Sequence, residues 1–169
     1  MRVTTVKDID ERRSPSMVHG LEGLVPDHTT RMGPAIRHLA ARLTRADAAT
    51  KILLVISDGR PYDLDYGQQY GEAAIMDYAI ADTARAMDEA RAHNVRPYLI
   101  TVDPAGGDYL SRMCDPQEYH VISDARDLPA ALGELYVVAR TDASRRGRSW
   151  RQAVAAAAGA AEYSGASSK

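Results

Sequence analysis

Aspartates follow each of the three apolar segments that we predict to be parallel strands. They are Asp58, Asp103 and Asp124, and the loop after the first segment adds Asp63 and Asp65. In an open α/β sheet the carboxyl ends of parallel strands lie along one rim, which is where ligands bind. We therefore expect a carboxylate-rich rim that suits a hard divalent cation or a basic partner surface.

The same aspartates also have a purely structural interpretation. An aspartate at the end of a strand commonly caps the next helix or shapes a turn. Asp103 stands directly before Pro104, as expected for a turn, and either Asp124 or Asp127 is placed to cap the final helix. For Asp103 and Asp124 this structural interpretation is the favoured one.

Asp58 has more informative neighbours. Residues 29–33, Thr-Thr-Arg-Met-Gly, open a predicted helix, and the next apolar strand ends at Ser57-Asp58-Gly59. This combination resembles the second and third elements of the metal-ion-dependent adhesion site of von Willebrand factor A domains. The resemblance implies that Thr30 and Asp58 help to hold Mg²⁺, directly or through water. It also implies that a carboxylate of a partner protein fills the open coordination position.

A longer resemblance covers residues 6–138. The stretches that carry it are 30–38, 57–63, 70–71, 97–103 and 108–110, and they resemble the C-terminal domain of the NorD/CbbO family. The resemblance implies a non-enzymatic interaction module that acts as an adaptor between a MoxR-type AAA+ ATPase and a metalloenzyme client. That client is nitric oxide reductase in one branch of the family and Rubisco in the other.

We predict that a partner contacts the polar loop that follows Asp58. The predicted contact residues are Arg60, Tyr62, Asp63 and Asp65. Tyrosine is enriched at the hot spots of protein interfaces. Tyr62, Tyr66 and Tyr70 can equally well pack the loop onto the rim, so both interpretations stand.

One part of the resemblance is missing from the sequence. The family's site begins with an Asp-x-Ser-x-Ser loop after a central strand, and the nearest match, residues 142–146, lacks the last serine. By analogy the chain also lacks the first strands of the domain. We expect weak or absent Mg²⁺ binding, because this ion requires near-octahedral oxygen coordination. A fragment is the favoured explanation, with strands from another chain or a re-paired sheet as alternatives.

The spacing of apolar residues predicts the elements that position the site. Strands are expected at 3–9, 52–56, 98–102 and 119–122, helices at 16–24, 34–45, 72–93 and 128–140, and a helical turn at 109–114. This alternation predicts right-handed βαβ units and a mostly parallel sheet. The expected fold is a Rossmann-like α/β three-layer sandwich over residues 1–140, a partial von Willebrand factor A domain. Residues 141–169, basic and then rich in Ala and Ser, are expected to form a marginal helix or to be disordered.

Composition argues against several other classes of protein. The formal net charge of −2 does not favour a nucleic-acid partner, and no apolar run is long enough for membrane insertion. The sole cysteine, Cys114, fits a cytoplasmic location. The sequence contains no motif for nucleophilic catalysis or phosphate binding that would indicate an enzyme. A metal-independent interaction domain is an alternative, and a Rossmann-like metal-dependent hydrolase is a less favoured one.

Overall fold

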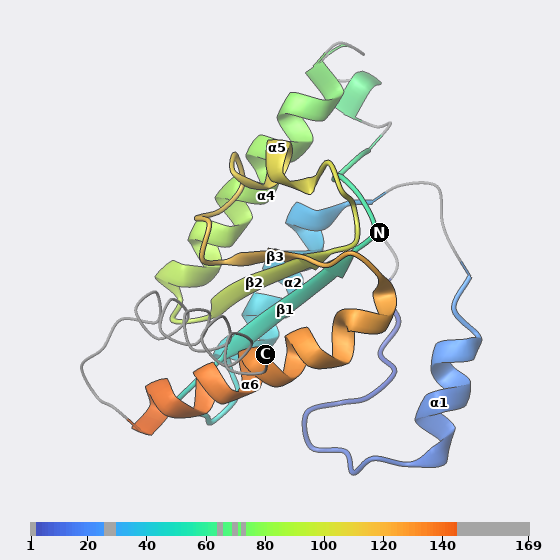
Figure 1. The fold of residues 1–169 in the computed structure, drawn as a ribbon, viewed down its shortest axis with the longest axis vertical. Helices are drawn as coiled ribbons and strands as arrows, with labels where there is room; N and C mark the ends of the chain where they lie inside the picture. Colours follow the sequence, from blue (N-terminus) through green and yellow to red (C-terminus); the bar gives the residue numbers. More distant parts are fainter. Residues whose placement is uncertain (1–2, 26–29, 64–65, 69–70, 72–73, 145–169) are drawn as a thin grey trace, which may run out of the picture.

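Three parallel strands form the sheet at the centre of the protein (Figure 1). The computed structural model describes residues 3–25, 30–63, 66–68, 71 and 74–144. The strands are β1 (Ile52–Ser57), β2 (Arg96–Thr101) and β3 (Tyr119–Val121), in the spatial order β1-β2-β3. The register places Leu54 beside Tyr98, and Leu99 beside Tyr119. This arrangement confirms the predicted α/β fold with a parallel sheet.

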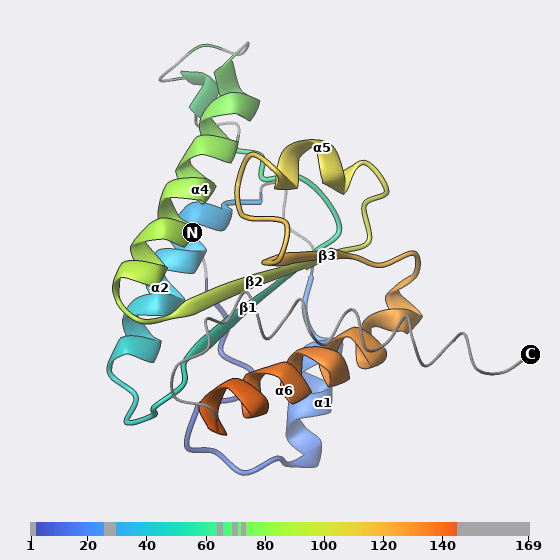
Figure 2. The same cartoon turned by 60° about the vertical axis from the view of Figure 1, so that its left-hand side comes forward.

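Helices cover both faces of this sheet, as the two views in Figures 1 and 2 show. α2 (Met32–Thr44) and α4 (Ile75–Ala92) lie on one face, and α6 (Leu128–Ser144) lies on the other. The central strand β2 is therefore buried on both faces, which explains why residues 97–100 form a continuous apolar run and do not alternate with polar ones. Among the described residues, no helix is long and apolar enough to cross a membrane.

The larger core lies between the sheet and the pair formed by α2 and α4. Leu53 and Leu99 enter it from the strands, and Ile36 and Met87 enter it from the helices. The buried positions of α4 are Ile75, Ala79, Ile80, Thr83, Ala86, Met87 and Ala90. They form one helical stripe, because side chains three and four residues apart share a face. Burial of each large apolar side chain in this core contributes about 1.5–3 kcal/mol.

A smaller core lies on the other face of the sheet, under α6. Tyr98 and Ile100 alternate with Leu99 along β2 and therefore point to this side, where they meet Ala131 and Leu135. Side chains that alternate along β2 thus supply both cores. The sheet and the helices on its two faces form the predicted three layers.

A left-handed residue ends α4 and turns the chain into β2. Asn94 has φ of 60°, and the N–H of Val95 donates to the carbonyl of Ala90 at 3.0 Å. The N–H of Asn94 donates to the carbonyl of Arg91 at 3.0 Å, which completes a Schellman motif. Asparagine directly after the last turn of a helix predicts such a left-handed cap, and the structure confirms it.

Three short elements complete the described chain. They are α1 (Pro15–Glu22), α5 (Gly106–Leu110) and the 3-10 helix η2 (Ala125–Asp127). α5 begins earlier than the turn expected at 109–114, and α6 continues to Ser144, past the predicted end at residue 140.

The strand expected at residues 3–9 is wrong. These residues form no strand, and all of them except Val6 are exposed. The segment is held to α2 by the Arg42 guanidinium, which donates to the Asp8 carboxylate at 2.8 Å. Alternating β-branched residues form a strand only when a neighbouring strand pairs with them, and no described strand lies beside this segment.

The spacing of apolar residues in α6 predicts that Leu132, Leu135, Tyr136 and Ala139 face inward, and the structure differs from this prediction at Tyr136. Leu135 is buried as predicted, but Tyr136 is 62% exposed. The stripe of contact with the sheet runs through Leu128, Ala131, Leu132 and Leu135, which are spaced at i, i+3, i+4 and i+7, and Tyr136 lies outside it. Ala139 was also expected to face inward, and its side chain lies outside the described part of the structure.

We expect Met87→Ala to lower the free energy of unfolding by about 2–5 kcal/mol, since it leaves a cavity in the larger core. The Met87 side chain is fully buried there. Chemical denaturation followed by circular dichroism measures the change. Leu24→Ala, at a position that is 50% exposed, is the control and should change stability by less than about 0.5 kcal/mol. Equal losses for the two variants would contradict this placement of the core.

Candidate functional site

The two segments that carry Thr30 and Asp58 are joined by a short backbone bridge. The N–H of Thr30 donates to the carbonyl of Tyr62 at 2.8 Å, and the N–H of Tyr62 donates to the carbonyl of Thr30 at 3.1 Å. This antiparallel bridge ties the residue that precedes α2 to the loop that follows β1. It brings together two parts of the candidate site that are far apart in sequence.

Asp58 lies in an exposed turn directly after β1. The Ser57 hydroxyl donates to the carbonyl of Gly59 at 2.8 Å, which fixes the turn around the aspartate. Thr30 is also exposed. Both predicted metal-ligating side chains are therefore open to solvent on the rim of the sheet.

A buried ion pair anchors the loop after β1. The Arg31 Nε lies 2.5 Å from the Asp63 Oδ2, and the Asp63 side chain is almost completely buried. A carboxylate removed from water is tolerated when a charged partner is at hydrogen-bond distance. Asp63 thus holds the loop against the start of α2, and a direct contact between Asp63 and a partner protein would require this pair to open.

Asp82 forms a second anchor, from the middle of α4. Its carboxylate accepts a hydrogen bond from the Tyr66 hydroxyl at 3.2 Å and pairs with the Arg37 guanidinium at 2.8 Å. The Tyr66 ring packs against Tyr78, with ring centroids 4.7 Å apart. Tyr66 therefore packs the loop onto the helix layer, which is one of the two roles weighed for the loop tyrosines.

Burial next to this carboxylate changes the ionisation of Tyr66. Desolvation is the largest cause, and the negative charge of Asp82 adds to it, so that the pKa of Tyr66 rises from 10.0 to about 12. Both causes oppose formation of the phenolate. The hydroxyl stays protonated as a donor to Asp82 across the whole neutral range.

Gly33 makes the approach of Asp82 possible. A Cβ atom built on Gly33 would lie 2.0 Å from the Asp82 Oδ2 and 2.8 Å from its carboxyl carbon. The glycine of the Thr-Arg-Met-Gly segment is therefore a packing requirement, because a side chain here would displace the carboxylate that positions both Arg37 and Tyr66.

The other rim aspartates have local structural roles. The Asp103 carboxylate accepts from the N–H of Ala105 at 2.9 Å, and the Asp124 carboxylate accepts from the N–H of Arg126 at 2.8 Å at the start of η2. Hydrogen bonds to Arg126 lower the pKa of Asp124. Within the described residues, no group of three or more His, Cys, Asp and Glu side chains is placed to hold a metal ion. A turn at Asp103 and a cap at Asp124 are confirmed, with the difference that Asp124 caps η2, which leads into the final helix.

The remaining predicted contact residues are only partly described. Arg60 is exposed, and its guanidinium carbon lies 5.8 Å from the centre of the Tyr109 ring, a cation–π distance. Tyr62 is 37% exposed beside the bridge to Thr30. Asp65 and Tyr70 lie outside the described residues.

The outer edge of β1 is open next to this site. The N–H of Arg96 donates to the carbonyl of Lys51, so in a parallel ladder the backbone groups of Ile52, Leu54 and Ile56 face away from β2. No strand in the described part of the chain pairs with them. Beside this edge lies a groove of about 300 Å³. It is lined by Thr30, Arg31, Met32, Ala35, Ile36, Leu39 and residues 54–57.

Sequence analysis missed Asp82 and Arg37, the residues that position the loop. They are 45 residues apart, and the spacing of charges on each helix is typical of a solvated face. One usable signal existed: a glycine inside the first turn of a helix is unfavourable unless something approaches closely. Gly33 was such a glycine.

The parallel sheet with helices on both faces places the chain in the class of Rossmann-like α/β proteins. The chain is similar to the protein NorD of Brucella melitensis, with 35% identity over 136 residues that cover 80% of the chain and 20% of that protein. It is also similar to NorD of Stutzerimonas stutzeri, with 37% identity over 105 residues that cover 62% of the chain and 16% of that protein. An uncharacterized protein of Pseudomonas aeruginosa is 34% identical over 137 residues, which cover 80% of the chain and 21% of that protein.

These similarities support membership of the NorD family. The chain spans about a fifth of the length of the curated relatives it matches. No family model matches the chain, and no solved structure matches it.

We expect Gly33→Ala to destabilise the protein, because its methyl group would occupy the position of the Asp82 carboxylate. The expected loss is about 1–3 kcal/mol, as for overpacking at a tight contact. Gly133→Ala in α6 is the matched control. Nothing lies within 4 Å of its added Cβ, and alanine should stabilise the helix by up to about 1 kcal/mol. Thermal unfolding of both variants measures the difference, and opposite signs are the expected result.

The raised pKa of Tyr66 predicts how stability depends on alkaline pH. The folded-state value of about 12 lies above the ordinary 10.0, so the stabilisation is complete below pH 10 and is lost as the pH rises toward 12. In Tyr66→Phe this part of the decline should disappear. Nuclear magnetic resonance of tyrosines labelled at Cζ follows the titration. A Tyr66 resonance that titrates at the ordinary value would contradict the buried contact with Asp82.

Proposed function

We propose that this chain is a non-enzymatic interaction module in which Thr30 and Asp58 contribute to a Mg²⁺ site of the adhesion type. The observation that carries this proposal is the bridge between Thr30 and Tyr62, which holds the helix-opening segment beside the loop after Asp58. A hydroxyl and a carboxylate are oxygen ligands of the kind that Mg²⁺ prefers. The Asp58 carboxylate has no ion-pair partner within the described ranges, so it is available to a metal.

Two protein ligands do not complete such a site. The sequence contains no Asp-x-Ser-x-Ser loop, so the proposed site takes its other ligands from a further strand. The open edge of β1 supports this idea, because no strand among the described residues pairs with the backbone groups of Ile52, Leu54 and Ile56. A strand that pairs with β1 would deliver its C-terminal loop to the rim that carries Asp58. Pairing would also remove the energetic cost of exposed edge groups.

The cellular role that we propose is that of an adaptor. A MoxR-type AAA+ ATPase would be one partner and a metalloenzyme client the other, either nitric oxide reductase or Rubisco. The similarity to proteins named NorD supports such a role, as does the sequence resemblance to that family. A carboxylate of the partner would take the open coordination position of Mg²⁺, and Arg60 and Tyr62 would contact the partner around it.

The test of the metal site compares the chain alone with the chain co-expressed with a segment that carries a strand and an Asp-x-Ser-x-Ser loop. Alone, the chain should show the same unfolding midpoint with and without Mg²⁺. In the complex, Mg²⁺ at about 100 times its dissociation constant should add about 2.7 kcal/mol of stability. Asp58→Ala should abolish this increase. Asp124→Ala, at a capping aspartate of the same rim, is the control and should keep it.

Two outcomes would favour other functions. If the complex binds the AAA+ ATPase equally well in Mg²⁺ and in EDTA, the chain is a metal-independent interaction domain. If the chain or the complex hydrolyses a substrate and Asp58→Ala removes that activity, the site is that of a metal-dependent hydrolase. Either result would overturn the adhesion-type site.

A further inference from the structure

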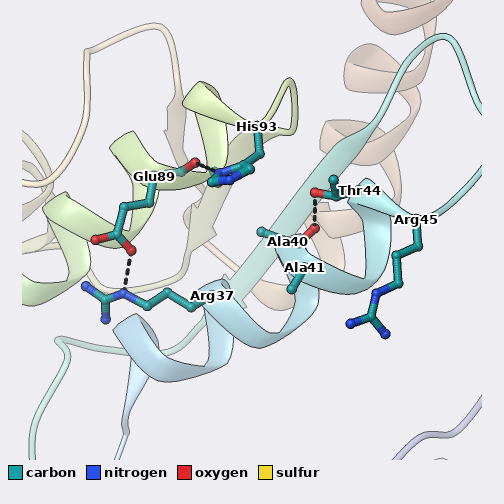
Figure 3. Close-up of a pocket in the computed structure, with 8 residues that line it drawn as sticks. Arg37, Ala40, Ala41, Thr44, Arg45, Glu89 and His93 are labelled. Carbon is teal, nitrogen blue, oxygen red and sulfur yellow. Dashed lines mark hydrogen bonds and ion pairs between the residues drawn. The ribbon is translucent and has the colours of Figure 1, made fainter.

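An apolar hollow of about 320 Å³ lies between the C-terminal halves of α2 and α4 (Figure 3). Its lining residues on α2 are Arg37, Ala40, Ala41, Thr44 and the capping Arg45, and those on α4 are Glu89, Ala90 and the capping His93. Thr30 and Asp58 are not among them, and Thr30 precedes the opposite end of α2. The hollow is therefore separate from the candidate metal site.

The hollow exists because three alanines meet where two helices cross. Ala40 and Ala90 are buried at its floor and Ala41 is exposed at its side, and none of the three has a side chain long enough to fill the space. Apart from the carbonyls of their last turns, the two helix backbones satisfy their own hydrogen bonds, so this surface offers apolar side-chain contact and no open strand edge. It suits an inserted apolar side chain, and it does not select an extended strand.

The charges around the hollow are unevenly compensated. On one side the Glu89 carboxylate is paired with Arg37 at 2.6 Å and with Arg85 at 3.1 Å, as Figure 3 shows for Arg37. On the other side the guanidinium of Arg45 has no ion-pair partner among the described residues. The His93 Nδ1 donates to the Glu89 carbonyl oxygen at 2.8 Å, so the outer Nε2 of the neutral ring is an acceptor and offers no donor to a carboxylate.

Arg45 and His93 each follow the last turn of a helix, where a positive charge is favourable to the helix dipole. That interaction explains why basic residues occur at these positions. It does not use the five N–H donors of the Arg45 guanidinium, which stay available for a carboxylate in bidentate geometry.

We propose that this α2–α4 groove is a docking site for an acidic amphipathic helix of a partner protein. One apolar side chain of that helix enters the hollow above Ala40 and Ala90. A carboxylate on a flanking turn faces the Arg45 guanidinium. A helix fits because its ridges pack between two helices, and its anchors at i, i+3 and i+4 leave acidic positions beside them. The site needs no metal and lies outside the proposed Mg²⁺ site.

The probe is a labelled helix-forming peptide with Leu on one face and Glu on the other. A matched peptide carries Lys in place of every Glu. Fluorescence anisotropy at physiological salt measures the binding of each peptide to the whole chain. We expect the Glu peptide to bind at least about tenfold more tightly than the Lys peptide, because rim charges select between partners of opposite sign.

Three variants locate the binding. Ala41→Trp fills the hollow from an exposed position, and Arg45→Glu reverses the unpaired charge; each should weaken the Glu peptide by about tenfold or more. Arg126→Glu makes the same charge change at η2, where the arginine is exposed and pairs with Asp124, and should leave binding intact. Arg45→Glu should also improve binding of the Lys peptide relative to wild type.

Other results would overturn the proposal. Equal binding by wild type and Ala41→Trp would place the peptide elsewhere, and an equal loss in Arg126→Glu would indicate unspecific charge attraction. If Ala41→Trp does not fold, methyl resonances of Ala40, Ala41 and Ala90 in the wild type provide the test, since they must shift on titration with the Glu peptide. EDTA and Asp58→Ala should leave this binding unchanged, which separates it from the Mg²⁺-dependent function.

Discussion

The pairing of β1 with β2 is the constraint from which the rest of the structure follows. Because β2 runs parallel to β1, the chain needs a crossover connection between the two strands, and α4 provides it. Helices cover β2 on both faces. Parallel strands end at the same rim, which places Ser57 and Thr101 side by side. The alternation of side chains along β2 then sends Leu99 to the core under α2 and α4, and Tyr98 and Ile100 to the core under α6.

The parts of the fold that the sequence predicts well are those with strong local signals. The apolar run of β2 is continuous because this central strand is buried on both faces, and the apolar run of β1 is as clear although β1 is an edge strand with Ile56 exposed. The left-handed turn at Asn94 is a local preference of asparagine. The segment at residues 3–9 has the composition of a strand, but no described strand lies beside it. Its β-propensity therefore does not produce a strand. The prediction that Tyr136 faces inward is wrong for a related reason, because apolar spacing does not show which side of the stripe packs against the sheet.

The sequence predicts the position of the candidate site, but it does not predict the ion pairs that support the site. Parallel strand ends on one rim follow from the fold class, so Asp58 was placed correctly after β1 from sequence alone. The supports are pairs between distant residues, such as Arg31 with Asp63 and Arg37 with Asp82. Nothing in the spacing of charges along one helix identifies a partner on another helix. The exception is Gly33, where an unfavourable residue type marks a place of close approach.

These supports bear on how the proposed metal site would work. The pairs Arg31–Asp63 and Tyr66–Asp82 hold Asp63 and Tyr66, two described residues that follow β1, against α2 and α4. Residues that are held in this way lose little conformational entropy when a partner binds, so more of the contact energy contributes to affinity. The missing ligands and the pairing of the β1 edge would come from the same strand. Metal affinity and strand pairing would therefore be linked, because Mg²⁺ binds strongly only where the strand is in place, and each Mg²⁺ bound stabilises that pairing by the same free energy.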